Sequence, residues 1–203
     1  MSLLVDPLTL EGFEAVFRAS PDPWGTRTRR DEAIKRTAIL RAVGGSPSGA
    51  SGCQARLLEL GSGNGSNSPA LAARALRLLA TDGAPSAVAL TRAALTGKPR
   101  AGAALAVLPG DLPRGPWQAC VIAEVLYYLS EADIRRLAHG LSRELAPRAQ
   151  LVLAHHHRHF PDTATPPARC HDRLLAALKR PYTRQTVARR RHWRVERVNL
   201  LQG

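Results

Sequence analysis

Short apolar runs alternate with helical stretches along most of the chain, beginning near residue 56. The runs are nearly continuous in aliphatic residues, which is typical of strands buried on both faces of a parallel sheet. The segments between them place apolar residues at helical spacing, and this alternation predicts an α/β fold. The expected strands are residues 56–60, 76–82, 103–108, 119–125 and 150–156, and the expected helices are residues 69–75, 86–96, 131–145 and 171–178.

The two ends of the chain follow different patterns. Residues 10–18 and 30–43 each place apolar side chains on one helical face, and a proline-containing break separates them. We interpret these helices as an N-terminal cap, joined to the core by the glycine- and serine-rich residues 44–52. At the other end, residues 185–190 and 192–201 predict a hairpin that closes one edge of the sheet.

The length of 203 residues fits one ordinary domain with a sizeable core. We expect a single domain over residues 1–203, with the cap and linker in 1–52 and the core in 53–203. The first residues lack a basic segment and interrupt their apolar runs with acids, so they predict neither a secretory signal nor a transmembrane helix. These features favour a cytoplasmic protein with no membrane partner, present as a monomer or weak dimer.

The three cysteines, Cys53, Cys120 and Cys170, are an odd number and lie too far apart for a Cys-x-x-Cys metal site. This usage fits a reducing compartment with unpaired thiols. A disulfide framework is therefore not expected.

The formal net charge of +13 raises the alternative of a nucleic-acid partner, because clustered cations release counterions from a phosphate backbone. Only three of the 29 basic residues are lysine (Lys35, Lys98 and Lys179), so arginine supplies the other 26. Such arginine usage, with abundant alanine and glycine, is also typical of a GC-rich coding bias. The arginines are spread along the chain, apart from a denser run at residues 188–194, so a nucleic-acid partner is an alternative and not the favoured interpretation.

The sequence LLELGSGNGSN at residues 57–67 joins a predicted strand to a predicted helix through three glycines. Such a turn brings backbone N–H groups and a helix N-terminus close to a ligand, because glycine has no Cβ to obstruct the approach. The dinucleotide fingerprint needs a third glycine where this chain has a serine, and a phosphate-binding P-loop needs a lysine that is absent. The spacing Glu59-x-Gly61-x-Gly63-x-Gly65 resembles instead the first motif of the class I S-adenosylmethionine-dependent methyltransferases.

This resemblance implies a doubly wound, mainly parallel seven-stranded sheet with an antiparallel last strand. In that family the glycine turn lies against the methionyl part of the cofactor, and an acid at the end of the second strand accepts the ribose hydroxyls. Asp82 matches that acid, with Gly83 beside it. Asp111, next to Leu112, matches the acid that lies beside the adenine amino group. The expected cofactor is therefore S-adenosylmethionine, with S-adenosylhomocysteine as the product.

Two further segments narrow the resemblance. AEVLYYL at residues 123–129 and Asp-Pro-Trp at residues 22–24 are similar to segments of the nodulation protein S (NodS) family, small enzymes that N-methylate an amino sugar of a chitooligosaccharide. In that family the tryptophan and a basic residue of the following helix line the cofactor site, which implies such roles for Trp24 and Lys35. An aromatic residue common in that helix is Asp31 here, and the chain diverges after the fifth strand, so the resemblance does not identify the acceptor.

Methyl transfer from a sulfonium is a direct displacement, so an enzyme must chiefly align the acceptor and remove a proton. Glu124, at the expected end of the fourth strand, is a candidate for cofactor or acceptor binding and for proton acceptance, or else an ordinary hydrogen-bonded acid. The histidines of AHHHRHF at residues 154–160 offer His155 as a second candidate, with a merely polar loop as the alternative. Neighbours on an extended strand point to opposite faces, so we expect no metal site. The expected cofactor-binding residues are Trp24, Lys35, Glu59, Gly61, Ser62, Gly63, Asp82, Gly83, Asp111, Leu112 and Glu124.

The expected activity is methyl transfer to the nitrogen of an amine or amino sugar in a small-molecule acceptor. O-methylation is the nearest alternative, and nucleic-acid or protein methylation is another, motivated by the positive charge. The fourth strand ends without the Asn/Asp-Pro-Pro-Tyr motif that similar enzymes use to grip a base amino group. A fold retained only for binding is a third alternative, opposed by the intact acids in the three cofactor motifs. Tyr127 and Tyr128 either stack on an acceptor ring or belong to the core.

Overall fold

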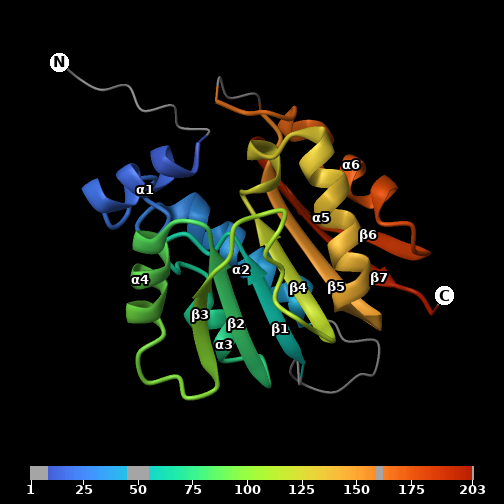
Figure 1. Ribbon diagram of the computed structural model, residues 1–203, viewed down its shortest axis with the longest axis horizontal. Coiled ribbons are helices and arrows are strands. Elements are labelled where there is room, and N and C mark those ends of the chain that lie inside the picture. Colours follow the sequence, from blue (N-terminus) through green and yellow to red (C-terminus); the bar gives the residue numbers. More distant parts are fainter. Residues whose placement is uncertain (1–8, 45–54, 159–161, 203) are drawn as a thin grey trace.

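A computed structural model describes residues 9–44, 55–158 and 162–202, and its centre is a seven-stranded sheet (Figure 1). The strand order is β3-β2-β1-β4-β5-β7-β6. Strands β1 to β5 are parallel, and β7 is antiparallel to both of its neighbours. This confirms the predicted fold class, with the terminal hairpin at one edge. The strands are β1 (Arg56–Leu60), β2 (Arg77–Asp82), β3 (Ala101–Leu105), β4 (Trp117–Ala123), β5 (Leu145–His156), β6 (Tyr182–Arg189) and β7 (Trp193–Leu200).

Helices cover both faces of this sheet (Figure 1). Alternate side chains of each central strand enter opposite layers: in β1, Leu58 and Leu60 pack toward α5 and α6, whereas Leu57 packs toward α2 and α3. This two-sided burial explains why the strands have nearly continuous apolar sequences. The helices are α1 (Leu10–Ala19), α2 (Arg30–Val43), α3 (Ser68–Ala72), α4 (Pro85–Ala94), α5 (Glu131–Glu144) and α6 (Cys170–Ala177).

Both helices of the expected N-terminal cap are present in the structure. Helix α1 packs against α4, with Phe17 buried beside Ala84 and Ala87. Helix α2 is fixed to β7, the strand next to the edge strand β6, because the buried indole of Trp193 in β7 donates a hydrogen bond of 2.8 Å to Asp31. Most of the expected linker lies outside the described residues, so the division between cap and core stays a prediction.

Several strand boundaries differ from the predicted ones, and the differences in β3, β4 and β5 are the largest changes within the parallel part of the sheet. Strand β3 ends before residue 106, because the chain then turns, and the N–H groups of Gly110 and Asp111 both donate to the carbonyl of Val107. Strand β4 ends at Ala123, since Glu124 adopts a positive φ of 56° that no strand accommodates. Strand β5 begins five residues early and pairs with β4 across an irregularity in register.

Helix α5 begins at the predicted residue 131, and a serine caps it. The Ser130 hydroxyl accepts a hydrogen bond of 3.1 Å from the N–H of Asp133, which satisfies one of the otherwise unpaired groups at the helix N-terminus. Among the described helices, none is long and apolar enough to cross a membrane.

Candidate functional site

A cavity of about 460 Å³ opens at the carboxyl ends of β1, β2 and β4. Open α/β sheets bind their ligands at this edge, where strand order reverses on either side of the first strand. Helices α1 and α2 and the loop between them form its other side. Of the predicted site residues, those that line the cavity are Trp24, Lys35, Gly61, Ser62, Gly63, Asp82, Gly83 and Glu124.

The glycine turn forms one wall of the cavity and requires its glycines. Gly61, Gly63 and Gly65 have φ values of 69°, 56° and 75°, which L side chains rarely adopt. A Cβ on Gly61 would lie 2.9 Å from the Cβ of Val125, and a Cβ on Gly65 would lie 2.9 Å from the Cα of Thr91. The turn therefore presents backbone to the cavity and packs closely against two neighbouring segments.

Asp82 lies at the end of β2, directly beside this turn. One carboxylate oxygen accepts the N–H of Gly63 at 2.8 Å, and the other accepts the N–H of Ala84 at 3.0 Å. Burial raises the pKa of Asp82, and these backbone donors oppose that rise. Each carboxylate oxygen has a second lone pair, so the side chain can also accept the two hydroxyls of a ribose.

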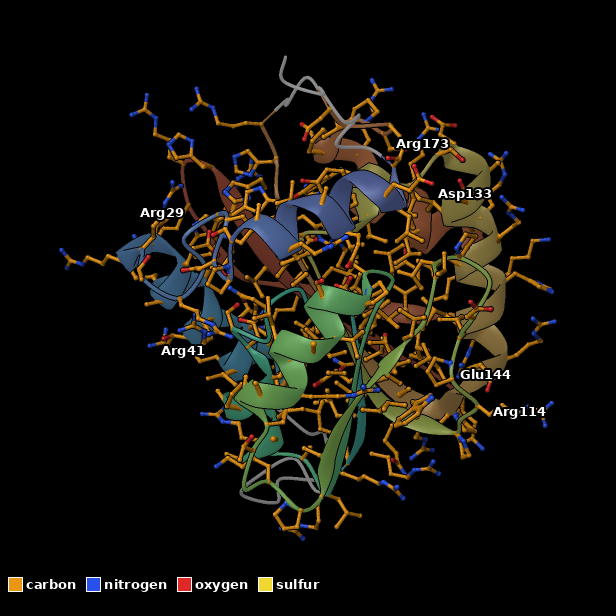
Figure 2. The ribbon with its side chains drawn as sticks, turned by 60° about the vertical axis from the view of Figure 1, so that its left-hand side comes forward. Arg29, Arg41, Arg114, Asp133, Glu144 and Arg173 are labelled. Carbon is orange, nitrogen blue, oxygen red and sulfur yellow. The ribbon has the colours of Figure 1, made fainter. Side chains whose placement is uncertain are left out.

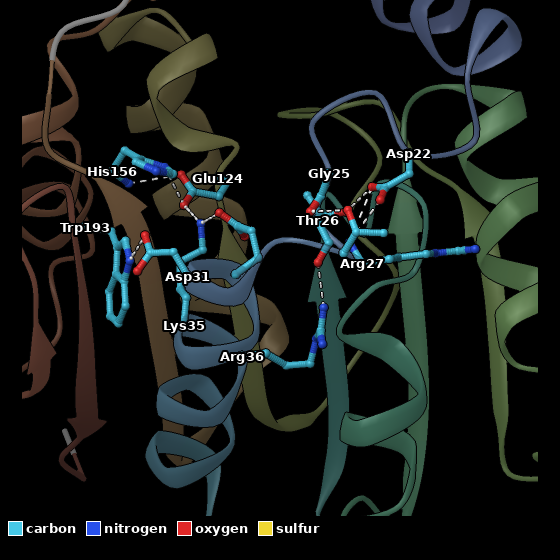
Figure 3. A network of polar contacts seen from close by, with 12 residues as sticks. Asp22, Gly25, Thr26, Arg27, Asp31, Lys35, Arg36, Glu124, His156 and Trp193 are labelled. Carbon is cyan, nitrogen blue, oxygen red and sulfur yellow. Dashed lines mark hydrogen bonds and ion pairs between the residues drawn. The ribbon is translucent and has the colours of Figure 1, made fainter.

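The segment that contains Trp24 is tied to the glycine turn by polar contacts. Figure 3 shows the part of this network around Asp22 and Thr26. Asp22 accepts hydrogen bonds from the hydroxyl of Thr26 at 2.9 Å and from the side-chain amide of Asn64 at 2.9 Å. The Thr26 hydroxyl also lies 3.1 Å from the amide oxygen of Asn64. The Asp-Pro-Trp sequence thus fixes a loop against residues 61–65, and Trp24 faces the cavity from this loop.

An ion-pair network occupies the cavity wall at the end of β4 (Figure 3). Lys35, only 3% exposed, contacts Glu124 and lies 2.8 Å from Glu32. Glu124 also accepts hydrogen bonds from the Tyr127 hydroxyl at 2.9 Å and from the backbone N–H of His156 at 3.0 Å. The Nδ1 atom of His156 lies 2.8 Å from the same carboxylate. The wall therefore combines one buried cation with two carboxylates.

Both members of the central ion pair stay charged at neutral pH. Burial alone would raise the pKa of Glu124, but the charge of Lys35 and the hydrogen bond from His156 hold it well below its usual range. Burial alone would lower the pKa of Lys35, but the charges of Glu124 and Glu32 raise it above its usual value. A carboxylate held in this way accepts a proton weakly, so the geometry favours Glu124 as a positioning and binding group over a base.

Four predicted site residues do not line the cavity within the part of the chain that is described. Glu59 is buried in β1 and accepts a hydrogen bond of 2.6 Å from Ser68. Asp111 is exposed in the turn after β3, and Leu112 packs against Gly140 of α5. His155 is buried below the turn that follows β4, with 1% of its surface exposed. Their roles toward the cofactor or the acceptor stay predictions, without a direct contact to the cavity.

Glu59 makes a testable contribution to the pH dependence of stability. Burial, and less strongly the charge of Asp82, raise its pKa to about 7 against the opposing hydrogen bond of Ser68. Its second carboxylate oxygen is buried without a hydrogen-bond partner among the described residues. The folded state therefore binds the proton more tightly than the unfolded state, so stability falls as pH rises from about 4.5 toward 7.

We therefore expect Glu59→Gln to stabilise the protein at pH 8, by about 2–3 kcal/mol, and to change stability little at pH 5. Urea denaturation at the two pH values measures this difference. Equal effects at both pH values would show that Glu59 carries no proton in the folded state.

Sequence reasoning missed the aromatic residues that α1 contributes to the cavity. Phe13 and Phe17 of α1 reach over the glycine turn, and Phe17 lies 3.5 Å from the position of a Gly63 Cβ. Tyr128 and His156 also line the wall, and Asp162 lies at its edge. The aromatic face of α1 was visible in the sequence as an ordinary amphipathic pattern, but no local signal shows that this face closes a site.

Comparison with protein families identifies a methyltransferase domain in this chain. A family model described as "Methyltransferase domain" matches residues 58–153, which contain the glycine turn, Asp82 and Glu124. A comparison with curated proteins finds no match.

Solved structures share the fold across nearly the whole chain. The N-methyltransferase NodS from Bradyrhizobium japonicum WM9, in complex with S-adenosyl-L-homocysteine, aligns with a TM-score of 0.75 at 21% identity. That alignment covers 94% of this chain and 97% of the NodS chain. A putative methyltransferase from Pseudomonas syringae aligns with a TM-score of 0.66 at 26% identity, over 84% of this chain and 99% of the other.

The glycine turn, the acid at the end of β2, the strand order and the domain match agree with one another. They confirm the predictions of enzyme class and cofactor. The chain is an S-adenosylmethionine-dependent methyltransferase with a methyltransferase domain over residues 58–153, and its fold resembles that of NodS.

Proposed function

We propose that this enzyme methylates the nitrogen of a small amine, such as an amino sugar. The observation that carries the proposal is the wall of aromatic rings and carboxylates beyond the glycine turn. Tyr127, Tyr128 and Phe13 meet there with Glu124 and Asp162. Aromatic faces and carboxylates together bind an ammonium group through cation–π attraction and charge. The related NodS is itself an N-methyltransferase.

The aromatic rings form a continuous group. The ring centroids of Tyr127 and Tyr128 are 4.6 Å apart, and those of Tyr128 and Phe13 are 4.8 Å apart. Phe13 in turn lies 6.3 Å from Trp24, between centroids. Burial, and then the charge of Asp162, raise the pKa of Tyr128 to about 12, so its phenol stays neutral. The wall thus offers ring faces and two anionic groups to an approaching amine.

Bound S-adenosylmethionine supplies a methyl group on a positively charged sulfur. The glycine turn and Asp82 would hold the cofactor, and the aromatic wall would align the amine with the methyl carbon. An alkylammonium acceptor must first lose a proton. The lone pair of the resulting amine would then form the N–C bond as the C–S bond breaks. His156 is the proposed proton acceptor, because its contact with ionised Glu124 places the proton on Nδ1 and leaves Nε2 as the basic nitrogen.

An acceptor screen tests this proposal. Isotope-labelled methyl transfer would be measured across simple amines, a chitooligosaccharide with one free amine, its fully N-acetylated counterpart, and RNA. We expect transfer to free amines and none to the N-acetylated partner or to RNA. Arg114→Ala, an exposed residue remote from the cavity, serves as the matched active control.

The distribution of positive charge bears on the RNA arm of this screen. Arg29 and Arg41 lie on the left of the molecule in Figure 2, and Arg114 and Arg173 lie on the right. This spread favours solvated side chains over one continuous nucleic-acid surface. Transfer to RNA in preference to every amine would contradict the proposal.

A further inference from the structure

A chain of buried side chains connects the turn after β4 with strand β7. The backbone N–H groups of Val125 and Leu126 lie 3.3 and 3.1 Å from Nε2 of His155. Nδ1 of His155 lies 2.8 Å from Nε2 of His171, and Nδ1 of His171 lies 2.6 Å from a Glu196 oxygen. His155, His171 and Glu196 are 1%, 0% and 4% exposed. Every nitrogen of both imidazole rings therefore has a partner.

The hydrogen bonds fix where each proton lies. Two backbone N–H donors point at Nε2 of His155, so that nitrogen must accept and the proton must lie on Nδ1. This Nδ1–H then donates to Nε2 of His171, whose own proton must lie on Nδ1. The order of donors and acceptors thus runs in one direction, from the backbone of the turn to Glu196.

The ionisation of Glu196, the last residue in this series of hydrogen bonds, agrees with the order of donors and acceptors. Burial would raise the pKa of Glu196, but hydrogen bonds from His171 and Arg184 lower it to about 2, so its carboxylate is ionised. Arg184 lies 2.7 Å from the oxygen that accepts from His171. Arg194 lies 3.3 Å from Nδ1 of His171, but the much shorter contact with a carboxylate requires the proton on that nitrogen.

The positions of the protons on His155 and His171 also argue against a metal ion bound between these residues and Cys170. His155, Cys170 and His171 bring three ligand atoms within 4.8 Å of one another. Metal binding at Nδ1 of His155 would move its proton to Nε2, where it would face the N–H groups of Val125 and Leu126. The Cys170 thiol donates instead to the carbonyl of Pro167 at 3.1 Å.

We propose that His155, His171 and Glu196 are positioning residues that hold the turn at Glu124–Leu126 by fixing the tautomer of His155. This turn matters because Glu124 has a positive φ and carries the ion-pair network, while Val125 lies against Gly61 of the glycine turn. Side chains that do not line the cavity thereby set the position of two of its walls, the glycine turn and the ion-pair network at Glu124. The tautomer of His155 and the cofactor affinity do not depend on the proposed function.

Two substitutions of His171 separate positioning from packing. His171→Leu removes the acceptor for the Nδ1–H of His155, whereas His171→Gln keeps an oxygen acceptor near the same place. We expect His171→Leu to weaken S-adenosylhomocysteine binding by on the order of tenfold and His171→Gln to stay within about twofold of the parent. Gln150→Leu is the matched control, because it removes a buried amide from the other end of the β5–β7 pair. It should leave the affinity unchanged.

Long-range proton–nitrogen NMR of histidine-labelled protein reads the tautomer directly. The expected result is Nδ1–H on both His155 and His171 in the parent, with the His155 signal altered in His171→Leu and retained in His171→Gln. Nε2–H on His155, stoichiometric zinc by elemental analysis, or equal affinities for all three variants would overturn the proposal. Failure of the acceptor screen alone would affect only the proposed function.

Discussion

Asp82→Ala should weaken S-adenosylmethionine binding by about 100-fold to 1000-fold, because it removes a carboxylate that can accept both ribose hydroxyls through charge-assisted hydrogen bonds. It also releases the N–H groups of Gly63 and Ala84, which this side chain now holds. Isothermal titration calorimetry measures the dissociation constant. Asp82→Asn keeps one acceptor oxygen and should give an intermediate value.

Glu131→Ala is the matched control for this experiment, since it removes a partly exposed acid that does not line the cavity. Its affinity should equal that of the parent. A folded Asp82→Ala protein with an unchanged dissociation constant would refute the role of Asp82 in holding the cofactor.

Lys35→Met should lower the free energy of unfolding by about 3–5 kcal/mol at neutral pH. The ammonium group is almost fully buried and contacts two carboxylates, so its removal leaves negative charges facing each other in the cavity wall. Urea denaturation measures the loss. Because protonation of Glu124 relieves the repulsion, the loss should shrink as the pH falls.

The double variant Lys35→Met/Glu124→Gln tests the cause of this destabilisation. Removing both charges should restore most of the lost stability, which gives a favourable coupling energy in a double-mutant cycle. Lys98→Met, at an exposed lysine, should change stability by less than about 0.5 kcal/mol. A loss in the double variant equal to that in the single one would show that packing, and not charge, explains the effect.

The site residues that directly follow a predicted strand could be identified from the sequence. The glycine turn and Asp82 lie directly at the ends of β1 and β2. Glycines at such a position let a ligand approach the backbone, and an acid there can accept ribose hydroxyls. Trp24 and Lys35 came from a family resemblance, and the structure places both in the cavity wall. The hydrogen bonds of Asp22 explain why the short Asp-Pro-Trp segment carries such a strong signal.

The assignment of the histidines depended on information that a sequence pattern does not contain. Alternation along β5 required that His155 and His156 point to opposite sides, but it did not show which one faces the cavity. The structure places His156 at the wall and His155 in the buried chain to Glu196, a residue 41 positions later in the sequence. The pairing of β5 with β7 and the packing of α6 against these strands bring the side chains together.

The position of Asp111 relative to the cavity could not be predicted from the order of the motifs. The turn after β3 begins at Val107, and Asp111 closes it through its backbone N–H, so the side chain stays at the exposed edge of the turn. Val107 and Leu108 line the cavity instead. The early end of β3 could not be seen from an apolar run that continues through residue 108.

The atom that receives the methyl group is the most direct test of the account. The enzyme would be incubated with S-adenosylmethionine carrying a ¹³C methyl group and a chitooligosaccharide with one free amine, and NMR would locate the labelled carbon in the product. We predict that the labelled carbon is bonded to nitrogen, and that the N-acetylated counterpart yields no labelled product. A label bonded to oxygen, or equal labelling of the two compounds, would contradict amine methylation.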